Sequence, residues 1–311
     1  MAETGTSGSV LAQEVSGKSS PQGVPYSSLK HFVNADGQCI YCRYWEPPTG
    51  TPVRALLCVA HGMGEHCERY DKIARRFNEN GVLVFAHDHV GHGRSEGTRE
   101  DITHFQFFIR DCHQHIDLMR SKYKDLPIFL YGHSMGATVA ILVAYERPSL
   151  FASTGVLLSS PAIKTSPETV TPFKLFLGRI LANVWPCAPM GKLESSMICR
   201  DPEVVKDYEN DPLVYHGKVM ARFAIELIQA MGRVETGLGD AWWPFLLQHG
   251  DQDKLTEISG SKLMYEKAPS KDKKLTVYEG CYHELDKEPG EDGERATQEL
   301  VDWLVERLPS H

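Results

Sequence analysis

The chain has 311 residues, of which 41% are hydrophobic and 24% are charged, and its formal net charge is −8. This composition is typical of a globular protein and excludes an intrinsically disordered chain. The negative net charge and the absence of a block of basic residues disfavour nucleic acid as a partner. The sequence contains no apolar stretch of about 18 residues, so no transmembrane helix is predicted.

Residues 1–25 are expected to form a flexible tail, because they are rich in Gly, Ser and Pro and contain acidic residues. They lack the apolar core of a secretory signal peptide. The eight cysteines are therefore expected to be free thiols in a reducing compartment, which predicts a cytoplasmic protein. Cys39 and Cys42 form a C-x-x-C, but they lie in a predicted strand, where positions three apart face opposite sides. No metal site is expected there.

After the tail, short apolar runs alternate with helix-length segments. Each run is continuously apolar, which is typical of strands buried on both faces. The alternation predicts an α/β fold with a mostly parallel central sheet flanked by helices. The predicted strands are 54–62, 81–88, 126–134, 154–161, 243–251 and 273–280, and the predicted helices are 68–81, 104–124, 135–148 and 293–308.

The alternation stops between residues 161 and 234, a segment with many prolines and no clear buried strand. This segment is expected to form a helical cap (a lid) over the carboxyl edge of the sheet, where open parallel sheets bind their ligands. The predicted organisation is a core in two parts, 26–160 and 235–311, interrupted by the cap insertion 161–234.

Within the cap, the pattern predicts an amphipathic helix that starts at Pro172, with Thr171 as its N-cap. Two interpretations remain open: the apolar face packs against its own domain, or it faces lipid. Leu175 and Trp185 widen the apolar surface, which favours peripheral contact with a membrane. The apolar face consists of Phe173, Phe176, Leu177, Ile180, Leu181 and Val184, and Lys174, Arg179 and Asn183 lie elsewhere.

The most specific motif is the G-x-S-x-G of residues 132–136, between an apolar strand and a helix. Its glycines suit a sharp turn that strains the serine backbone and raises the hydroxyl above the sheet. Ser134 is therefore the predicted nucleophile.

A serine nucleophile needs a general base, which is itself oriented by a carboxylate. In the fold that carries this motif, the order along the chain is Ser, acid, His. His283 follows the last predicted strand and is the predicted base. Asp251 and Asp253 both follow the strand before it. Asp253 is preferred, since Asp251 directly follows a glycine and suits the turn.

Two backbone N–H groups are expected to form an oxyanion hole for the negative charge that develops on the substrate. Met135 follows the nucleophile and supplies one of them. Met63, in the H-G-x-G loop of residues 61–64, supplies the other, and the flanking glycines allow close approach of the substrate.

His87, His89 and His92 have a spacing that metal-dependent hydrolases use. Their loop, however, also resembles the D-x-x-G-x-G-x-S loop that is common after an early strand of this fold. A metal site would need an added acidic ligand, and Gly91 stands where an Asp often precedes the third histidine. The loop is therefore expected to brace the catalytic edge, with no metal and no cofactor.

Five strings, "HGMGEHCERY", "VFAHDHVGHGRSEG", "GHSMGA", "NDPLVYHG" and "YEGCYHEL", stand in this order. Together they resemble the monoacylglycerol lipase family of serine hydrolases, which has the α/β-hydrolase fold. The resemblance extends from about Tyr26 to the C-terminal helix and implies a triad of Ser134, Asp253 and His283. It implies hydrolysis of monoacylglycerols to fatty acid and glycerol through an acyl-enzyme.

The resemblance also implies that the glycerol head group is held by Glu65, Arg69, His133 and Tyr208. For Glu65 and Arg69 another interpretation is an ion pair at the start of a helix. Asp286 stands where relatives often have a histidine and Met63 where they often have Ala, so head-group preference is not settled. In relatives, regulatory cysteines are proposed in the cap and in the loop that carries the acid. Tyr215, Arg222 and Thr256 stand at the matching positions of this chain, so regulation through these thiols is not predicted.

Three other functions remain open. One is a lysophospholipase or broader carboxylesterase of the same fold. The second is a metal-dependent hydrolase built on the three histidines, and the third is a non-catalytic lipid-binding protein. Acyl-chain preference and oligomeric state are not predicted.

Overall fold

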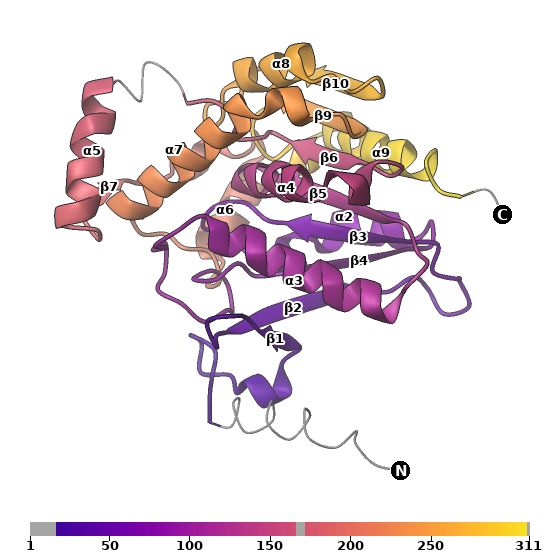
Figure 1. Ribbon diagram of the computed structural model, residues 1–311, viewed down its shortest axis with the longest axis horizontal. Coiled ribbons are helices and arrows are strands. Elements are labelled where there is room, and N and C mark those ends of the chain that lie inside the picture. The colour runs from indigo at the N-terminus through magenta and orange to yellow at the C-terminus, as the bar shows by residue number, and fades with distance from the viewer. Residues whose placement is uncertain (1–16, 166–171, 310–311) are drawn as a thin grey trace.

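The computed structural model describes residues 17–165 and 172–309, which form a central sheet covered by helices (Figure 1). The sheet has eight strands in the order β1-β2-β4-β3-β5-β6-β9-β10. The strands from β4 to β10 are parallel, whereas β1–β2 and β2–β4 pair antiparallel. The strands are β1 (His31–Val33), β2 (Cys39–Trp45), β3 (Ala55–Ala60), β4 (Val82–His87), β5 (Ile128–His133), β6 (Val156–Ser159), β9 (Phe245–Gly250) and β10 (Lys273–Tyr278).

Helices cover both faces of this sheet, as Figure 1 shows. One core contains side chains of α3 (Gln106–Lys122), α4 (Met135–Glu146) and α8 (Ile258–Lys267). The second core contains side chains of α2 (Asp71–Asn78) and α9 (Glu291–Val305). This arrangement confirms the predicted α/β-hydrolase fold.

Strand β3 shows how the sequence pattern produces these two cores. Leu56 and Cys58 point into the core of α3 and α4, and Leu57 and Val59 point into the core of α2 and α9. Successive side chains of a strand alternate between faces, so a strand covered on both faces needs a continuous apolar run. Each fully buried side chain of this size contributes about 1.5–3 kcal/mol.

Two strands differ from the prediction because they lie at the edges of the sheet. The run 273–280 was expected to be buried on both faces, but β10 has one neighbour and is half-exposed along most of its length. At the other edge, β1 is too short for its apolar pattern to have been recognised. The predicted helix 68–81 also begins later, since Cys67–Tyr70 forms a 3₁₀ turn before α2.

The tail predicted for residues 1–25 extends too far, because residues 17–25 make defined contacts. Lys18 forms an ion pair with Glu96 at 3.1 Å, and Ser19 pairs with Pro25 in an isolated β-bridge. Residues 17–25 are therefore held against the folded domain by polar contacts to the loop that contains Gly93 and Glu96. Residues 1–16 lie outside the described part of the chain.

The segment predicted as the cap lies between β6 and β9. Its short strands pair antiparallel, which the sequence did not predict. α5 packs on α7, and a Cβ on Gly178 would lie 3.1 Å from Ile225. In Figure 1 this pair extends beyond the sheet on the left. Its elements are α5 (Pro172–Val184), β7 (Pro189–Gly191), α6 (Pro202–Asn210), β8 (Val219–Met220) and α7 (Ala221–Thr236).

Some predictions about the cap helix cannot be followed in the structure. The predicted N-cap Thr171 and the side chains of residues 172–176 lie outside the described residues. The helix does begin at Pro172. Within 17–165 and 172–309, no helix combines the length and the apolar composition that a membrane span requires.

Candidate active site

Ser134 occupies the turn that joins β5 to α4, with φ 55° and ψ −122°. A positive φ in a serine costs about 1–3 kcal/mol and persists only where the surroundings enforce it. A Cβ on Gly132 would clash with the backbone of Ala137, and a Cβ on Gly136 would clash with the carbonyl oxygen of Ala60. The two glycines of the motif therefore allow the close approach of strand, turn and helix.

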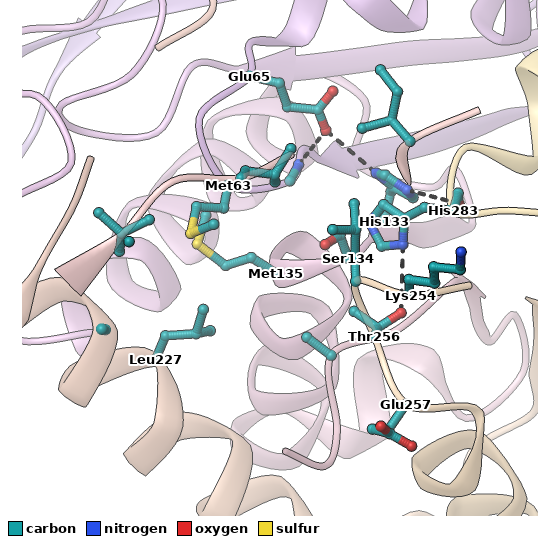
Figure 2. Close-up of a pocket in the computed structure, with 18 of the residues that line it drawn as sticks. Met63, Glu65, His133, Ser134, Met135, Leu227, Lys254, Thr256, Glu257 and His283 are labelled. Atoms are coloured by element: carbon teal, nitrogen blue, oxygen red, sulfur yellow. Dashed lines mark hydrogen bonds and ion pairs between the residues drawn. The ribbon is translucent and has the colours of Figure 1, made fainter. Parts of the chain in front are cut away.

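His283 and Asp253 come together from the loops that follow β10 and β9. Nδ1 of His283 donates to Oδ2 of Asp253 at 2.7 Å, and both side chains are buried. This bond leaves Nε2 of His283 available to a substrate or nucleophile. Ser134 and His283 line the same pocket (Figure 2). Asp251 is exposed instead, and its carboxylate accepts from the N–H of Gly280 at 2.7 Å.

The carboxylate of Asp253 is fixed by further donors. The N–H groups of Leu255 and Thr256 donate to Oδ1 at 2.8 and 3.0 Å, and Oγ1 of Thr256 donates to Oδ2 at 2.8 Å. Nε2 of His249 lies 3.4 Å from Oδ2. Burial alone would raise the pKa of Asp253, but the charge of His283 and hydrogen bonds from His249 and His283 hold that pKa well below its usual range. Asp253 is therefore ionised at neutral pH.

Sequence reasoning missed the supporting role of Thr256 and His249. A signal for Thr256 was present, because an Asp commonly binds the backbone N–H groups two and three residues later. His249 had no such signal, since it lies inside β9 and reads as a buried strand residue.

The loop after β3 lies against Ser134. A Cβ on Gly62 would be 3.3 Å from Cβ of Ser134, and the N–H of Gly62 donates to Oε1 of Glu65 at 2.5 Å. The predicted oxyanion donors Met63 and Met135 both line the pocket of Ser134. Met135 is also the first residue of α4, where the helix dipole favours negative charge.

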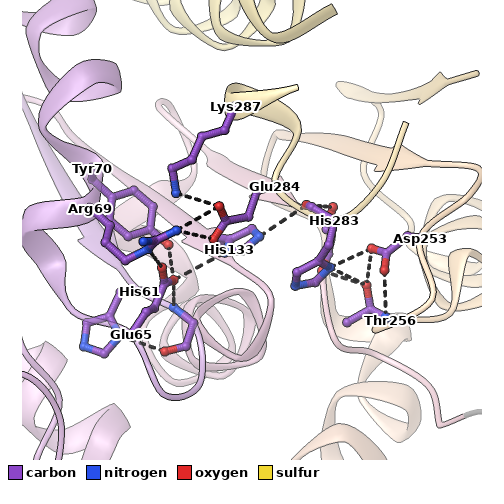
Figure 3. A network of polar contacts seen from close by, with 12 residues as sticks. His61, Glu65, Arg69, Tyr70, His133, Asp253, Thr256, His283, Glu284 and Lys287 are labelled. Atoms are coloured by element: carbon purple, nitrogen blue, oxygen red, sulfur yellow. Dashed lines mark hydrogen bonds and ion pairs between the residues drawn. The ribbon is translucent and has the colours of Figure 1, made fainter. Parts of the chain in front are cut away.

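A buried polar network surrounds Glu65 (Figure 3). Its Oε1 accepts from the hydroxyl of Tyr70 at 2.6 Å and lies 3.4 Å from Nδ1 of His133. Its Oε2 accepts from Nε of Arg69 at 3.2 Å. Burial alone would raise the pKa of Glu65, but the hydrogen bond and charge of His133, with the nearby cations, hold that pKa well below its usual range. Glu65 thus connects the loop of residues 61–64 to His133, the residue before Ser134.

The same network continues to Glu284, the residue after His283. Both carboxylate oxygens of Glu284 accept from Nη2 of Arg69 at 2.9 Å, and Nζ of Lys287 donates to Oε2 at 3.0 Å. Burial alone would raise the pKa of Glu284, but Lys287 and Arg69 lower the pKa to about 2. Two ionised carboxylates therefore share one guanidinium beside His283.

Only three of the four residues that were predicted to hold the glycerol head group line the pocket. Glu65, His133 and Tyr208 line the pocket, but Arg69 does not. Arg69 lies behind them, paired with Glu65 and with its guanidinium 4.9 Å from the ring centre of Tyr208. Glu284, which the sequence analysis did not select, takes part in the lining.

The pocket has a volume of about 430 Å³, which lies in the usual range for small-molecule sites. Three lysines also line it, Lys164, Lys192 and Lys254; the first is half-exposed and the other two are exposed. The pocket therefore has an apolar side and a polar end, and the polar end is lined by Glu65, His133, Tyr208 and Glu284. Ser134 lies in the pocket wall (Figure 2). The larger apolar residues in the lining are Met63, Met135, Met190, Leu193, Ile198, Leu227, Met231 and Leu255.

His89, from the histidine-rich loop, contacts the loop of residues 61–64. Nε2 of His61 accepts from the N–H of His89 at 2.9 Å, and the two rings are 4.2 Å apart. Burial lowers the pKa of His61 to about 3, so its other nitrogen, Nδ1, carries the proton and donates to the carbonyl of Gly62 at 2.8 Å. The loop therefore supports the residue that precedes Met63.

His87 and His92 have other partners. Nδ1 of His87 lies 3.2 Å from Nδ1 of His115, and Nε2 of His92 lies 3.0 Å from a carboxylate oxygen of Glu100. Across the described residues, no three His, Cys, Asp or Glu side chains are grouped to hold a metal ion. The geometry gives the metal-dependent alternative no ligand set in this part of the chain.

Comparison with known proteins agrees with this geometry. Residues 51–290 match the protein family Hydrolase_4, described as serine aminopeptidase S33. The chain is 44% identical to the monoglyceride lipase of Rattus norvegicus and 45% identical to that of Homo sapiens, in each case over 96% of this chain and 97% of the relative.

Among solved structures, the fold is similar to the monoacylglycerol lipase of Paleococcus ferrophilus. The TM-score is 0.75 and the identity is 30%, over 86% of this chain and 99% of that one. A soluble variant of monoglyceride lipase from Saccharomyces cerevisiae, in complex with a substrate analog, has a TM-score of 0.80 at 22% identity, over 95% of this chain and 98% of that one. The latter likeness supports the fold alone.

Proposed function

This chain belongs to the Hydrolase_4 (serine aminopeptidase S33) family of α/β-hydrolases, and we propose that it hydrolyses monoacylglycerols to a fatty acid and glycerol. The observation that carries the proposal is the strained Ser134 in the wall of a pocket with an apolar side and a polar end. Relatives named monoglyceride lipase, similar over nearly the whole chain, support the choice of substrate.

In the proposed mechanism, Oγ of Ser134 attacks the ester carbonyl while Nε2 of His283 takes the hydroxyl proton. Asp253, ionised and fixed by its donors, holds the proton of His283 on Nδ1 and stabilises the imidazolium. The backbone N–H groups of Met63 and Met135 bind the oxyanion. Each such donor contributes about two to three powers of ten to the rate.

The tetrahedral intermediate then expels glycerol, which receives the proton from His283. This leaves the fatty acyl group esterified to Ser134. Water, deprotonated by His283, then attacks the acyl carbonyl. The bond from that carbonyl to Oγ of Ser134 breaks, Oγ takes the proton back from His283, and the fatty acid leaves. Every proton is carried by the chain's own side chains, so the proposed reaction requires no metal or cofactor.

The apolar side of the pocket suits the acyl chain, and the polar end suits the glycerol hydroxyls. Glu65, His133 and Tyr208 are the proposed contacts of glycerol, since all three take part in the lining. Arg69 acts through Glu65 and Tyr208, because it contacts both and does not reach the pocket surface. It is therefore proposed as a positioning residue.

We also propose peripheral contact with a membrane through α5 and the residues that follow it, in a protein of the cytoplasm. The exposed fraction is 47% for Leu177, 46% for Ile180, 80% for Val184 and 60% for Trp185. These apolar side chains extend from one helix and its C-terminal end. An exposed apolar surface of this kind is typical of helices that lie in the membrane interface.

The proposal is tested by turnover of four esters by the full-length chain: a monoacylglycerol, a diacylglycerol, lysophosphatidylcholine and a short p-nitrophenyl ester. We expect the highest kcat/KM with the monoacylglycerol and no turnover by Ser134→Ala. Preference for lysophosphatidylcholine would assign a lysophospholipase instead. Lipid binding without turnover of any ester would assign a non-catalytic protein.

A further inference from the structure

Glu284 lies at the polar end of the pocket, between the catalytic base and a pair of cations. It directly follows His283, and its N–H donates to the carbonyl of Ile198, near the start of α6, at 2.7 Å. Its side chain is almost completely buried, yet it takes part in the pocket lining. A substrate head group that reaches this end meets Glu284 together with Glu65, His133 and Tyr208.

Two cations, Arg69 and Lys287, form ion pairs with the carboxylates at this end of the pocket. Arg69 donates to Glu65 and Glu284, and Lys287 donates to Glu284. Arg69 and Lys287 are both absent from the pocket lining. The hydrogen bonds from the two cations therefore end on protein carboxylates (Figure 3). In each ion pair the acidic residue, Glu65 or Glu284, lines the pocket and the basic residue does not.

From this arrangement we infer that Glu284 is a specificity-determining residue, which restricts the pocket to uncharged head groups and rejects phosphate-bearing ones. The inference rests on the proposed function, because it assumes that the head group of the ester occupies the polar end. Glycerol hydroxyls donate well to carboxylates. A phosphate brings only acceptor oxygens and negative charge, and like charges in a buried site repel strongly.

Three lysines of the pocket lining could in principle attract a phosphate. Lys164, Lys192 and Lys254 are half-exposed or exposed, so water and salt screen their charge. Arg69 is in a different situation, because only 8% of its side chain is exposed and its charge is little screened once a carboxylate is removed. Lys287 is 20% exposed and adds a smaller attraction. Loss of Glu284 should therefore convert the polar end into a site that accepts an anion.

The test compares Glu284→Gln with the unsubstituted chain on two substrates of equal acyl chain, 1-acylglycerol and 1-acylglycerol 3-phosphate. Gln keeps the size and the oxygen acceptor of Glu and removes the charge. We expect the ratio of kcat/KM for the phosphate ester to that for the neutral ester to rise about tenfold, mainly through KM. Glu279→Gln is the matched control, because Glu279 is exposed and its loss changes the net charge equally; its ratio should change less than about twofold.

A second measurement does not depend on a lipid substrate. With a p-nitrophenyl ester as the reporter, glycerol 3-phosphate should inhibit Glu284→Gln more strongly than it inhibits the unsubstituted chain, and glycerol should inhibit both similarly. An unchanged ratio and unchanged inhibition in Glu284→Gln would overturn the inference while leaving monoacylglycerol hydrolysis intact. Turnover of the phosphate ester by the unsubstituted chain as fast as the neutral one would also overturn it. Failure to hydrolyse 1-acylglycerol at all would instead reject the proposed function.

Discussion

The two sides of the pocket are constructed in different ways. The core side carries polar side chains that are fixed by buried hydrogen bonds, as with Asp253 and its neighbours Thr256 and His283. The cap side supplies apolar side chains such as Leu227, and α5 presents Leu177 to solvent. Hydrogen bonds are directional and apolar contacts are not. Changes on the core side should therefore alter turnover, and changes to the exposed cap surface should alter lipid binding.

The largest expected effect comes from the two aspartates of the loop after β9. Asp253→Asn should lower kcat about 10⁴-fold, because the amide cannot hold the proton of His283 on Nδ1. Asp251→Asn should lower it less than about tenfold, since Asp251 only accepts from the N–H of Gly280. Steady-state kinetics with a p-nitrophenyl ester distinguish the two. Equal losses in both variants would argue against Asp253 as the orienting carboxylate.

Thr256 provides a smaller test on the same side. Thr256→Val removes the hydroxyl that donates to Oδ2 of Asp253 at 2.8 Å and keeps the shape of the side chain. Loss of a hydrogen bond to a charged group should lower kcat about thirtyfold with little change in KM. Thr256→Ser restores the hydroxyl and should recover most of the rate. If Thr256→Ser is as slow as Thr256→Val, the side chain acts through packing and not through its hydroxyl.

The smallest expected effect belongs to the cap. Replacement of Leu177, Ile180 and Trp185 by Ser should weaken sedimentation with neutral phosphatidylcholine liposomes about fivefold. Turnover of a short soluble ester should be unchanged, because these side chains are exposed and are not part of the pocket lining. Binding should depend little on salt. Unchanged sedimentation of the triple variant would remove the membrane role of α5, and a loss of soluble-ester turnover would break the division between the two sides.

The elements that were predicted well are those whose signal lies within a short stretch of the sequence. Five of the six predicted strands are buried and follow from their apolar runs, and the turn at Ser134 follows from glycines two positions away on either side. The pairing of Asp253 with His283 was also accessible, because the carboxyl ends of parallel strands meet at one edge of the sheet. For these residues, position along a strand determines position in space.

The remaining features depend on contacts between distant parts of the chain. Arg69 and Glu284 are 215 residues apart, and no local pattern indicates that they meet. Their pairing also explains why Arg69 lies behind the pocket surface, where the sequence had placed it among the residues that hold the head group. The short edge strand β1 and the contacts of residues 17–25 with the loop that contains Glu96 depend in the same way on residues that are distant in the sequence.

The most direct measurement of the central claim is the site of covalent modification by a fluorophosphonate, which reacts with activated serine nucleophiles. The full-length chain would be labelled, digested and analysed by mass spectrometry. We predict one adduct, on Ser134, that is absent in Ser134→Ala and forms far more slowly in Asp253→Asn. An adduct on another residue, or no adduct on the folded protein, would contradict the account.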